Sequence, residues 1–177
     1  MSQTLRQTIY EKEQVPISFD EIMKALRGIA DPNFILLDDL SENPTDEQLF
    51  KSKDCALVLC TVHSRTHGKK FNHWISIIKR PKEYWYYDSL ANSIAKLTTL
   101  LHNGKRSLVN WAAGKRVREN TVQTQKYDVH VSTCGYHQIV RIARKDLDPK
   151  KFIRWLTHGM MEPDLSVSFM CYLSQLK

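Results

Sequence analysis

The sequence lacks any long hydrophobic run. Its most apolar stretches, such as "ALVLC" and "WISII", are far shorter than the roughly 20 residues that cross a bilayer. Its first residues, "MSQTLRQTIYEKEQ", contain no apolar signal core. The sequence therefore predicts neither a membrane-spanning segment nor a secretory leader, and we expect an intracellular protein, cytoplasmic or nuclear, with no membrane partner.

Internal repeats, low-complexity tracts and Pro/Gly/Ser-rich linkers are also lacking. The length of 177 residues and the 42% hydrophobic content suit a single domain, 1–177, in which residues 1–14 form a mobile arm or one short element. The four cysteines include no CxxC pair, which argues against a redox motif or a ribbon-type zinc site. We expect reduced thiols and no metal or other cofactor.

Acidic side chains are fewer than basic ones, 19 against 26, which gives a formal net charge of +7. Basic residues cluster in "GKK", in "GKR" and in "RIARKDLDPKK". Such an excess attracts polyanions through a salt-screened field that does not read sequence, so non-specific contact with DNA is one expectation. The alternative is a solvated basic face.

Hydrophobic patterns along the chain alternate between strand-like and helix-like periods. A capping box of Ser18 and Glu21 opens the first predicted helix, "ISFDEIMKALRG". Strands are predicted in "PNFILLDDL", "CALVLCTVHS", "NHWISIIKR" and "YWYYDS", the last two as an antiparallel hairpin around "PKE", and a further strand plus loop in "NTVQTQKYDVHVS". The other predicted helices are "NPTDEQLF", "SLANSIAKLTTLLHNG", "GYHQIVRIARK", "DPKKFIRWLTHG" and "EPDLSVSFMCYLSQL". The pattern is α+β, with a central, mostly antiparallel sheet flanked by helices.

Cys134 stands directly before Gly135, where a β-like run changes into a helix-like one in "VHVSTCGYHQIVRIARK". The dipole and the free N–H groups of a helix start favour a thiolate, which is the nucleophilic form of cysteine. Gly135 would let the backbone of a substrate approach. The alternative is that Cys134 is a small buried hydrophobic residue.

A thiol nucleophile also needs a base and a group that orients the base. His73, next to Trp74 at the start of a strand, offers an imidazole that can face a cleft. Asp88 ends the next strand of the hairpin, so cross-strand neighbours could bring its carboxylate to the other nitrogen of the ring. The alternatives are an ordinary hydrogen-bonded histidine and, for Asp88, a turn or N-cap role that Ser89 could equally fill.

A developing oxyanion needs hydrogen-bond donors. Gln125 lies upstream of Cys134 in a polar stretch, and its side-chain amide could donate beside the Cys134 backbone N–H. Gln123 is the competing assignment. Each of these signals is weak alone, yet the order His, Asp, Gln, Cys-Gly is hard to produce by chance.

This ordered set, "NHW…YYDSL…Q…STCGYH", resembles the thiol proteases related to adenovirus endopeptidase (adenain) and the Ulp1-type SUMO proteases. The resemblance covers roughly residues 55–145 through motifs. Beyond them, "DPKKFIRWL…EPDLSVSFM" resembles the C-terminal helices of small proteases in virophages, Maverick/Polinton elements and large DNA viruses. The resemblance implies a Ulp1/adenain-like, papain-related cysteine protease fold.

By position, the resemblance implies that Cys134 is the nucleophile and His73 the general base. It implies further that Asp88 is the orienting acid, that Gln125 is the oxyanion donor and that Trp74 walls the substrate cleft.

The glutamine departs from the family pattern, because Gln125 lies further before Cys134 than in the relatives. A two-residue bulge in "KYDVHVS" would reconcile the spacing. Asn120 before Gln125 fits an "N…Q" pattern of viral relatives.

The activity that the resemblance implies is that of a viral maturation cysteine endopeptidase. Its substrates would be capsid or core precursor proteins cut at glycine-rich sites, and it would act as a monomer in the virion and in the cytoplasm or nucleus of the host cell. DNA and a viral peptide activate the adenovirus relative, so the basic clusters fit contact with packaged DNA.

Other functions stay open. Within the same fold the chain could be an isopeptidase that removes SUMO or ubiquitin, an acetyltransferase, or an inactive relative with a capsid or scaffold role. From another class comes a zinc-stabilised nucleic-acid-binding protein, for which "CTVHSRTHGKKFNH" offers Cys60, His63, His67 and His73.

Overall fold

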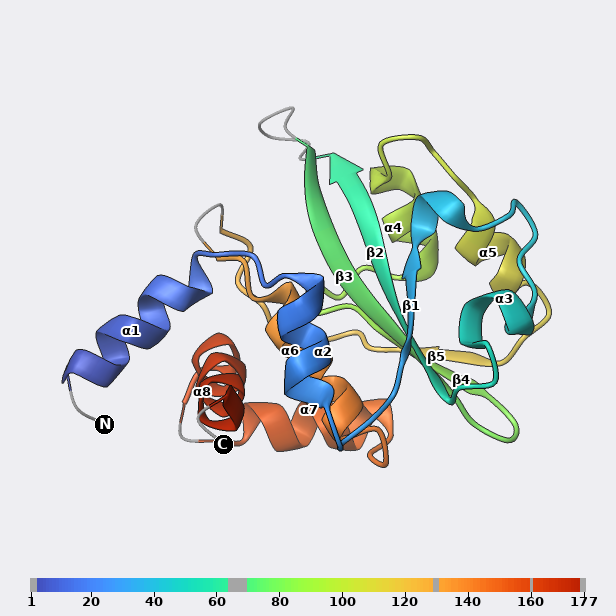
Figure 1. Cartoon of the computed structure of the whole chain (residues 1–177). Helices are drawn as coiled ribbons and strands as arrows, with labels where there is room; N and C mark the ends of the chain where they lie inside the picture. The colour runs from blue at the N-terminus through green and yellow to red at the C-terminus, as the bar shows by residue number, and fades with distance from the viewer. Residues whose placement is uncertain (1–2, 64–69, 129–130, 160, 176–177) are drawn as a thin grey trace.

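A five-stranded sheet lies at the centre of the computed structural model, which describes residues 3–63, 70–128, 131–159 and 161–175 (Figure 1). The strands follow one another in chain order: β1 (Asn33–Leu36), β2 (Cys55–His63), β3 (Lys70–Lys79), β4 (Tyr84–Tyr87) and β5 (Val117–Glu119). The pairs β2–β3 and β3–β4 are antiparallel, whereas the outer pairs β1–β2 and β4–β5 are parallel. The predicted antiparallel centre is confirmed, and a parallel strand is added at each edge.

Helices cover both faces of this sheet, which confirms the α+β class. They are α1 (Gln3–Glu13), α2 (Phe19–Leu26), α3 (Asp46–Phe50), α4 (Ile94–Leu100), α5 (Ser107–Ala112), α6 (Cys134–Ala143), α7 (Pro149–Thr157) and α8 (Pro163–Gln175), with a 3-10 helix, η1 (Leu37–Asp39). One face packs against α2, α6, α7 and α8. The other packs against η1, α3, α4 and α5.

Strand β3 is buried on both faces and divides the two cores. Successive side chains of a strand point to opposite faces, so Trp74 and Ile78 join the core under α6 while Ile75 and Ile77 join the core under α4 and α5. Burial of large apolar side chains on both sides fixes the register of β3. His73, at the rim of this buried stretch, is therefore held in a defined place.

Three predicted helix starts are confirmed by their caps. Ser18 and Glu21 form the capping box of α2, and Thr45 forms a second capping box at α3. Asp148 caps α7 by accepting hydrogen bonds from two backbone N–H groups, with Pro149 at the first helical position.

The strand predicted within residues 120–132 is wrong for the part of that stretch that the structure describes. Strand β5 lies upstream of it, and residues 120–128 and 131–133 form a loop. The N–H groups of Thr124 and Gln125 both donate to the carbonyl of Ser89, so a neighbouring turn takes the bonds that a strand partner would take.

The helix predicted from "SLANSIAKLTTLLHNG" is shorter than expected, because its first residues form a turn. Ala91 adopts a positive φ of 53°, and α4 begins only at Ile94, capped by Ser93. This excludes Asp88 and Ser89 as N-caps of α4. The short elements α5 and β5 were not predicted.

The N-terminal residues 3–13 form helix α1, which contacts α8. The polar loop predicted in "RTHGKKF" lies largely outside the described residues. Within the described ranges, no helix combines the length and the apolar character needed to cross a membrane.

Candidate active site

A buried ion pair joins His73 of β3 to Asp88, the residue that follows β4. The imidazole Nε2 lies 2.8 Å from the Asp88 carboxylate, and the two side chains are 2% and 0% exposed. Antiparallel pairing places Ser76 opposite Tyr87 and so carries Asp88 toward His73. The structure thus brings together two residues that the sequence separates by a hairpin.

Four further contacts hold the Asp88 residue in place. Its carboxylate accepts a hydrogen bond from the Leu90 N–H at 2.7 Å and from the Asn92 side chain at 3.0 Å. Asn120 clamps the backbone, because its side chain accepts from the Asp88 N–H at 2.9 Å and donates to the Asp88 carbonyl at 2.7 Å. The oxygen that faces His73 also accepts from the Leu90 N–H, and the other oxygen accepts from Asn92, so both carboxylate oxygens are held in place.

The electrostatics of the pair favour charge on both partners. Burial lowers the pKa of His73, but the Asp88 charge and hydrogen bond, together with the interaction with Cys134, outweigh it and raise the pKa of His73 above its ordinary value. Burial raises the pKa of Asp88, but the His73 charge and the hydrogen bonds of that carboxylate outweigh this effect and lower it. The geometry favours an imidazolium next to a carboxylate.

Cys134 is the first residue of α6 and is in contact with this pair. Its thiol lies close enough to the imidazole to raise the pKa of His73. Because Asp88 takes Nε2 of the ring, Nδ1 is left for the thiol. Thiol, imidazole and carboxylate thus form the series that nucleophilic cysteine chemistry uses.

The other three cysteines differ from Cys134 in position. Burial raises the pKa of both Cys55 and Cys171 to about 12, and it raises the pKa of Cys60 even further. All three thiols stay protonated at neutral pH. Of the four cysteines, Cys134 is the one that lines a surface groove.

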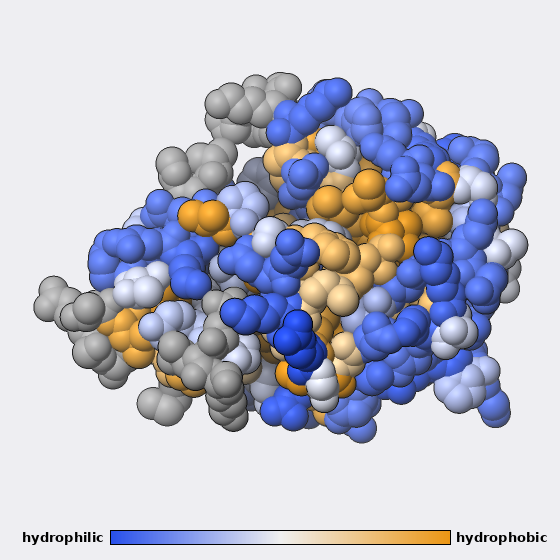
Figure 2. Space-filling model, in the orientation of Figure 1, coloured by the Kyte–Doolittle hydropathy of each residue, from blue (hydrophilic) through white to orange (hydrophobic). Residues whose placement is uncertain are grey.

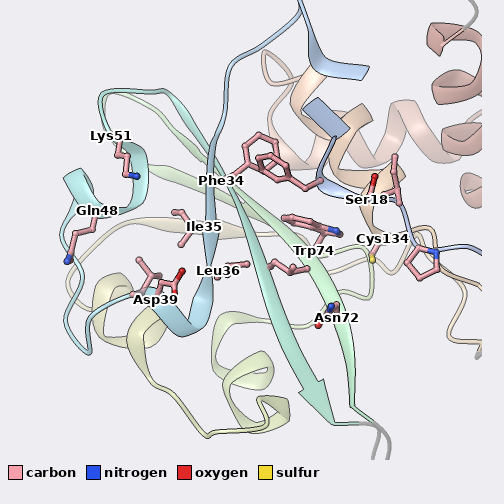
Figure 3. Close-up of a pocket in the computed structure, with 15 residues that line it drawn as sticks. Ser18, Phe34, Ile35, Leu36, Asp39, Gln48, Lys51, Asn72, Trp74 and Cys134 are labelled. Carbon is pink, nitrogen blue, oxygen red and sulfur yellow. The ribbon is translucent and has the colours of Figure 1, made fainter. Parts of the chain in front are cut away.

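This groove has a volume of about 730 Å³ and runs from Cys134 toward β1 and α3. In Figure 3, Cys134, Trp74 and Ser18 lie at one end of it, while Asp39, Gln48 and Lys51 lie at the other, beyond the β1 residues. Figure 2 shows apolar surface in the middle of this face of the molecule, surrounded by hydrophilic side chains. An extended peptide could lie in such a groove with its carbonyl next to the thiol.

Trp74 lines the groove, as the cleft-wall assignment requires. Its ring contacts Phe34 edge-on, with ring centroids 6.3 Å apart, and Phe34 contacts Phe19 in turn at 4.5 Å. Strand β1 and helix α2 thereby extend the aromatic wall that Trp74 begins.

The environment of Gly135 differs from the open approach path expected for it. A Cβ at this position would lie 2.0 Å from Cγ2 of Ile17 and 3.3 Å from the Trp74 ring. The missing side chain makes room for Ile17, in the segment before α2. Contact of Gly135 with a substrate stays a prediction, whereas the structure shows that Gly135 packs against Ile17.

The Gln125 side chain is buried, while Gln123 is exposed. Ser89 donates a hydrogen bond to the Gln125 amide oxygen at 2.7 Å, and the amide nitrogen donates to the Val131 carbonyl at 3.4 Å. These partners follow Asp88 and precede Cys134 in the chain. This position favours Gln125 over Gln123, and the role of oxyanion donor stays a prediction.

No group of three or more His, Cys, Asp or Glu side chains within the described residues could hold a metal ion. Of the four predicted zinc ligands, His73 is bound to Asp88 and His67 lies outside those residues. Cys60 and His63 are on β2, where residues an odd number of positions apart point to opposite faces.

Two positions in the site carried no sequence signal. Asn92 follows Asp88 by one turn and is an ordinary loop residue until the turn brings its amide to the carboxylate. Ile17 lies in a different part of the sequence from Gly135, and no local pattern marks that contact. Neither Asn92 nor Ile17 lies in a strand, so the alternation of side chains along the strands gives no information about them.

No protein-family model and no curated protein matches the sequence. Among solved structures, the chain is similar to the ASFV pS273R protease at 13% identity and a TM-score of 0.48, over 93% of this chain and 68% of that one. It is also similar to the SUMO protease Ulp1 with the catalytic cysteine oxidized to a sulfonic acid, at 16% identity and a TM-score of 0.35, over 96% and 78%. Similarity at this level does not place the chain in a family.

Replacement of Gly135 by alanine should destabilise the protein, because the new methyl group would overlap Ile17. We expect Gly135→Ala to lose about 1–3 kcal/mol of unfolding free energy in chemical denaturation. The double variant Ile17→Ala, Gly135→Ala should lose less than the sum of the two single variants, since Ile17→Ala removes the overlapping atom. Additive losses would contradict this contact.

Replacement of Asp88 by asparagine should lower the pKa of His73, because the charge that opposes the effect of burial is removed. NMR titration of the imidazole protons measures this shift. In the wild type the raised pKa stabilises the folded state at pH values below the unfolded value of about 6.5, and the contribution is lost as pH rises through the folded pKa. A His73 that titrates alike in both proteins would contradict the ion pair.

Proposed function

We propose that this chain is a cysteine endopeptidase of virus maturation, with Cys134 as nucleophile, His73 as general base and acid, and Asp88 as the residue that orients His73. The observation that carries the proposal is the buried His73, held by Asp88 at 2.8 Å and in contact with Cys134 at the end of an apolar groove. A buried charged pair beside a thiol that lines a groove is the kind of site where proteins do acid–base chemistry.

The chemistry follows from this order of groups. The Cys134 thiol gives its proton to His73, and its sulfur attacks the carbonyl carbon of a peptide bond to form a C–S bond while the carbonyl electron pair moves to the oxygen. Collapse of this intermediate breaks the C–N bond, and His73 gives its proton to the departing amine. Water then attacks the thioester while His73 takes a proton from it. The C–S bond breaks, the carboxylic acid leaves, and His73 returns its proton to the sulfur, which restores the thiol.

Two sources of donors would stabilise the oxyanion. The first N–H groups of α6 lack partners within the helix, and they begin at Cys134. Gln125 offers the second source: an amide group carries two N–H donors, so one can bond Val131 while the other faces the oxyanion.

The substrate in this proposal is an extended polypeptide with glycine next to the scissile bond. Trp74 and Ile17 crowd the start of α6, where they would leave little room for a substrate side chain. Between its two ends the groove is lined by Phe34, Ile35 and Leu36 of β1, which suits bulky side chains of the same peptide.

The biological setting is supported by the resemblance of "NHW…YYDSL…Q…STCGYH" and the C-terminal helices to viral proteases. We assign to the chain the cleavage of capsid or core precursors inside virus particles and infected cells, as a monomer. The charge of +7 supports non-specific contact with packaged DNA as part of this setting.

A fluorogenic peptide with Gly-Gly before the scissile bond tests the proposal directly. The wild type should cleave it, and Cys134→Ala should reduce the rate to that without enzyme, because the nucleophile is removed. Cys171→Ala, which changes a buried cysteine outside the groove, is the matched control and should retain activity.

SUMO and ubiquitin conjugates distinguish the alternative. Cleavage of these conjugates without cleavage of the peptide would replace the endopeptidase by an isopeptidase. Cleavage of neither substrate class would remove the proposed function.

A further inference from the structure

A second buried histidine–aspartate pair lies beside the site without belonging to it. Nε2 of His137 on α6 is 3.0 Å from the carboxylate of Asp164, which stands in the first turn of α8. His137 is fully buried and Asp164 is 5% exposed, so neither group faces the groove. The mechanism proposed above uses neither residue.

Asp164 is bound by three groups from the nucleophile region. The Thr133 hydroxyl and His137 both donate to one of its carboxylate oxygens, and the backbone N–H of Lys126 donates to the other at 2.8 Å. Burial raises the pKa of Asp164, but these bonds and the His137 charge outweigh it and lower that pKa. The carboxylate is therefore ionised at neutral pH and accepts from all three donors.

His137 extends the network to two further hydroxyl groups. Its Nδ1 lies 3.2 Å from the Tyr87 hydroxyl and 3.4 Å from the Thr124 hydroxyl, which are 2.7 Å from each other. Both hydroxyl-bearing side chains are buried. Charged or titratable groups that face the network are Glu13, Lys126, Glu162, Arg141 and Asp88.

The members of this network have a common position in the chain. Tyr87 directly precedes Asp88, and Thr124 directly precedes Gln125. Thr133 directly precedes Cys134. The network thus ties together the residues that come immediately before three of the four candidate catalytic residues.

We propose that Asp164, acting through His137 and Thr133, is the positioning residue of this site. This assignment rests on the function proposed above. In it, helix α8 holds Tyr87, Thr124 and Thr133 through the network and thereby fixes the positions of the residues that follow them, Asp88, Gln125 and Cys134, relative to one another. The loop of residues 120–133 has no strand partner in its described part, so these bonds replace a sheet ladder as the source of its geometry.

Removal of the carboxylate tests this assignment with two readouts. One is the rate of Cys134 alkylation by iodoacetamide at about pH 6, and the other is kcat and KM for the Gly-Gly peptide. We expect Asp164→Ala to lower the alkylation rate and kcat at least about tenfold, with KM changed by no more than about twofold, because misplaced catalytic groups lose rate rather than binding.

Asp148→Ala is the matched control. Asp148 also accepts backbone hydrogen bonds at a helix start, but its partners are the N–H groups of Lys150 and Lys151 in α7. Its removal should lower the melting temperature and leave both rates of the folded protein unchanged. An Asp164→Ala protein that melts earlier but keeps both rates within about twofold of the wild type would overturn the proposal.

If Asp164→Ala does not fold, Tyr87→Phe tests the same assignment. It removes one hydroxyl from the network and keeps the packing of the ring, so we expect a fall in kcat of about threefold or more. Unchanged kcat in Tyr87→Phe would then overturn the proposal. If the wild type cleaves no peptide, the proposed function fails, and the alkylation rates of the same variants still decide whether Asp164 positions Cys134.

Discussion

The site depends on one interaction, the buried ion pair of His73 and Asp88. Two charges removed from water are stable only if they are paired and hydrogen-bonded, and loss of one partner from such a pair costs about 3–5 kcal/mol. The turn after β4 supplies the missing bonds through Leu90 and Asn92, while Asn120 holds the backbone. The shape of residues 88–92, including the late start of α4, follows from this requirement.

The site is built partly from regular elements, the sheet and α6, and partly from the irregular loop between β5 and α6. The sheet places His73 and Asp88 through a register fixed by apolar burial on both faces of β3. Helix α6 presents Cys134 at its first residue. The loop between β5 and α6 has no regular partner of its own in the described residues. Its position is set by hydrogen bonds to Ser89 in the turn after β4, to His137 of α6 and to Asp164 of α8. An irregular loop held by buried polar bonds can carry a donor such as Gln125 close to a helix start.

Much of this arrangement could be predicted from the sequence because it rests on local rules. Runs of apolar, β-branched and aromatic residues predicted β2, β3 and β4, and capping residues predicted α2, α3 and α7. The loop around Gln125 was wrongly predicted as a strand plus loop, since its alternating pattern looks like a strand, and only a distant carboxylate, Asp164, reveals what its polar groups bind. The contact between Gly135 and Ile17 was also beyond reach, because a glycine before a helical pattern does not say which residue fills the space it leaves.

The measurement that tests the central claim most directly is cysteine labelling by iodoacetamide at about pH 6, mapped by mass spectrometry, in the wild type and in His73→Ala. All four cysteines are buried, but burial raises the thiol pKa values of three of them, whereas Cys134 lines the groove beside His73. The ion-pair account therefore predicts that Cys134 alone reacts fast in the wild type. It predicts further that this reactivity is lost in His73→Ala. Equal labelling of all four cysteines, or fast labelling of Cys134 that persists without His73, would contradict the account.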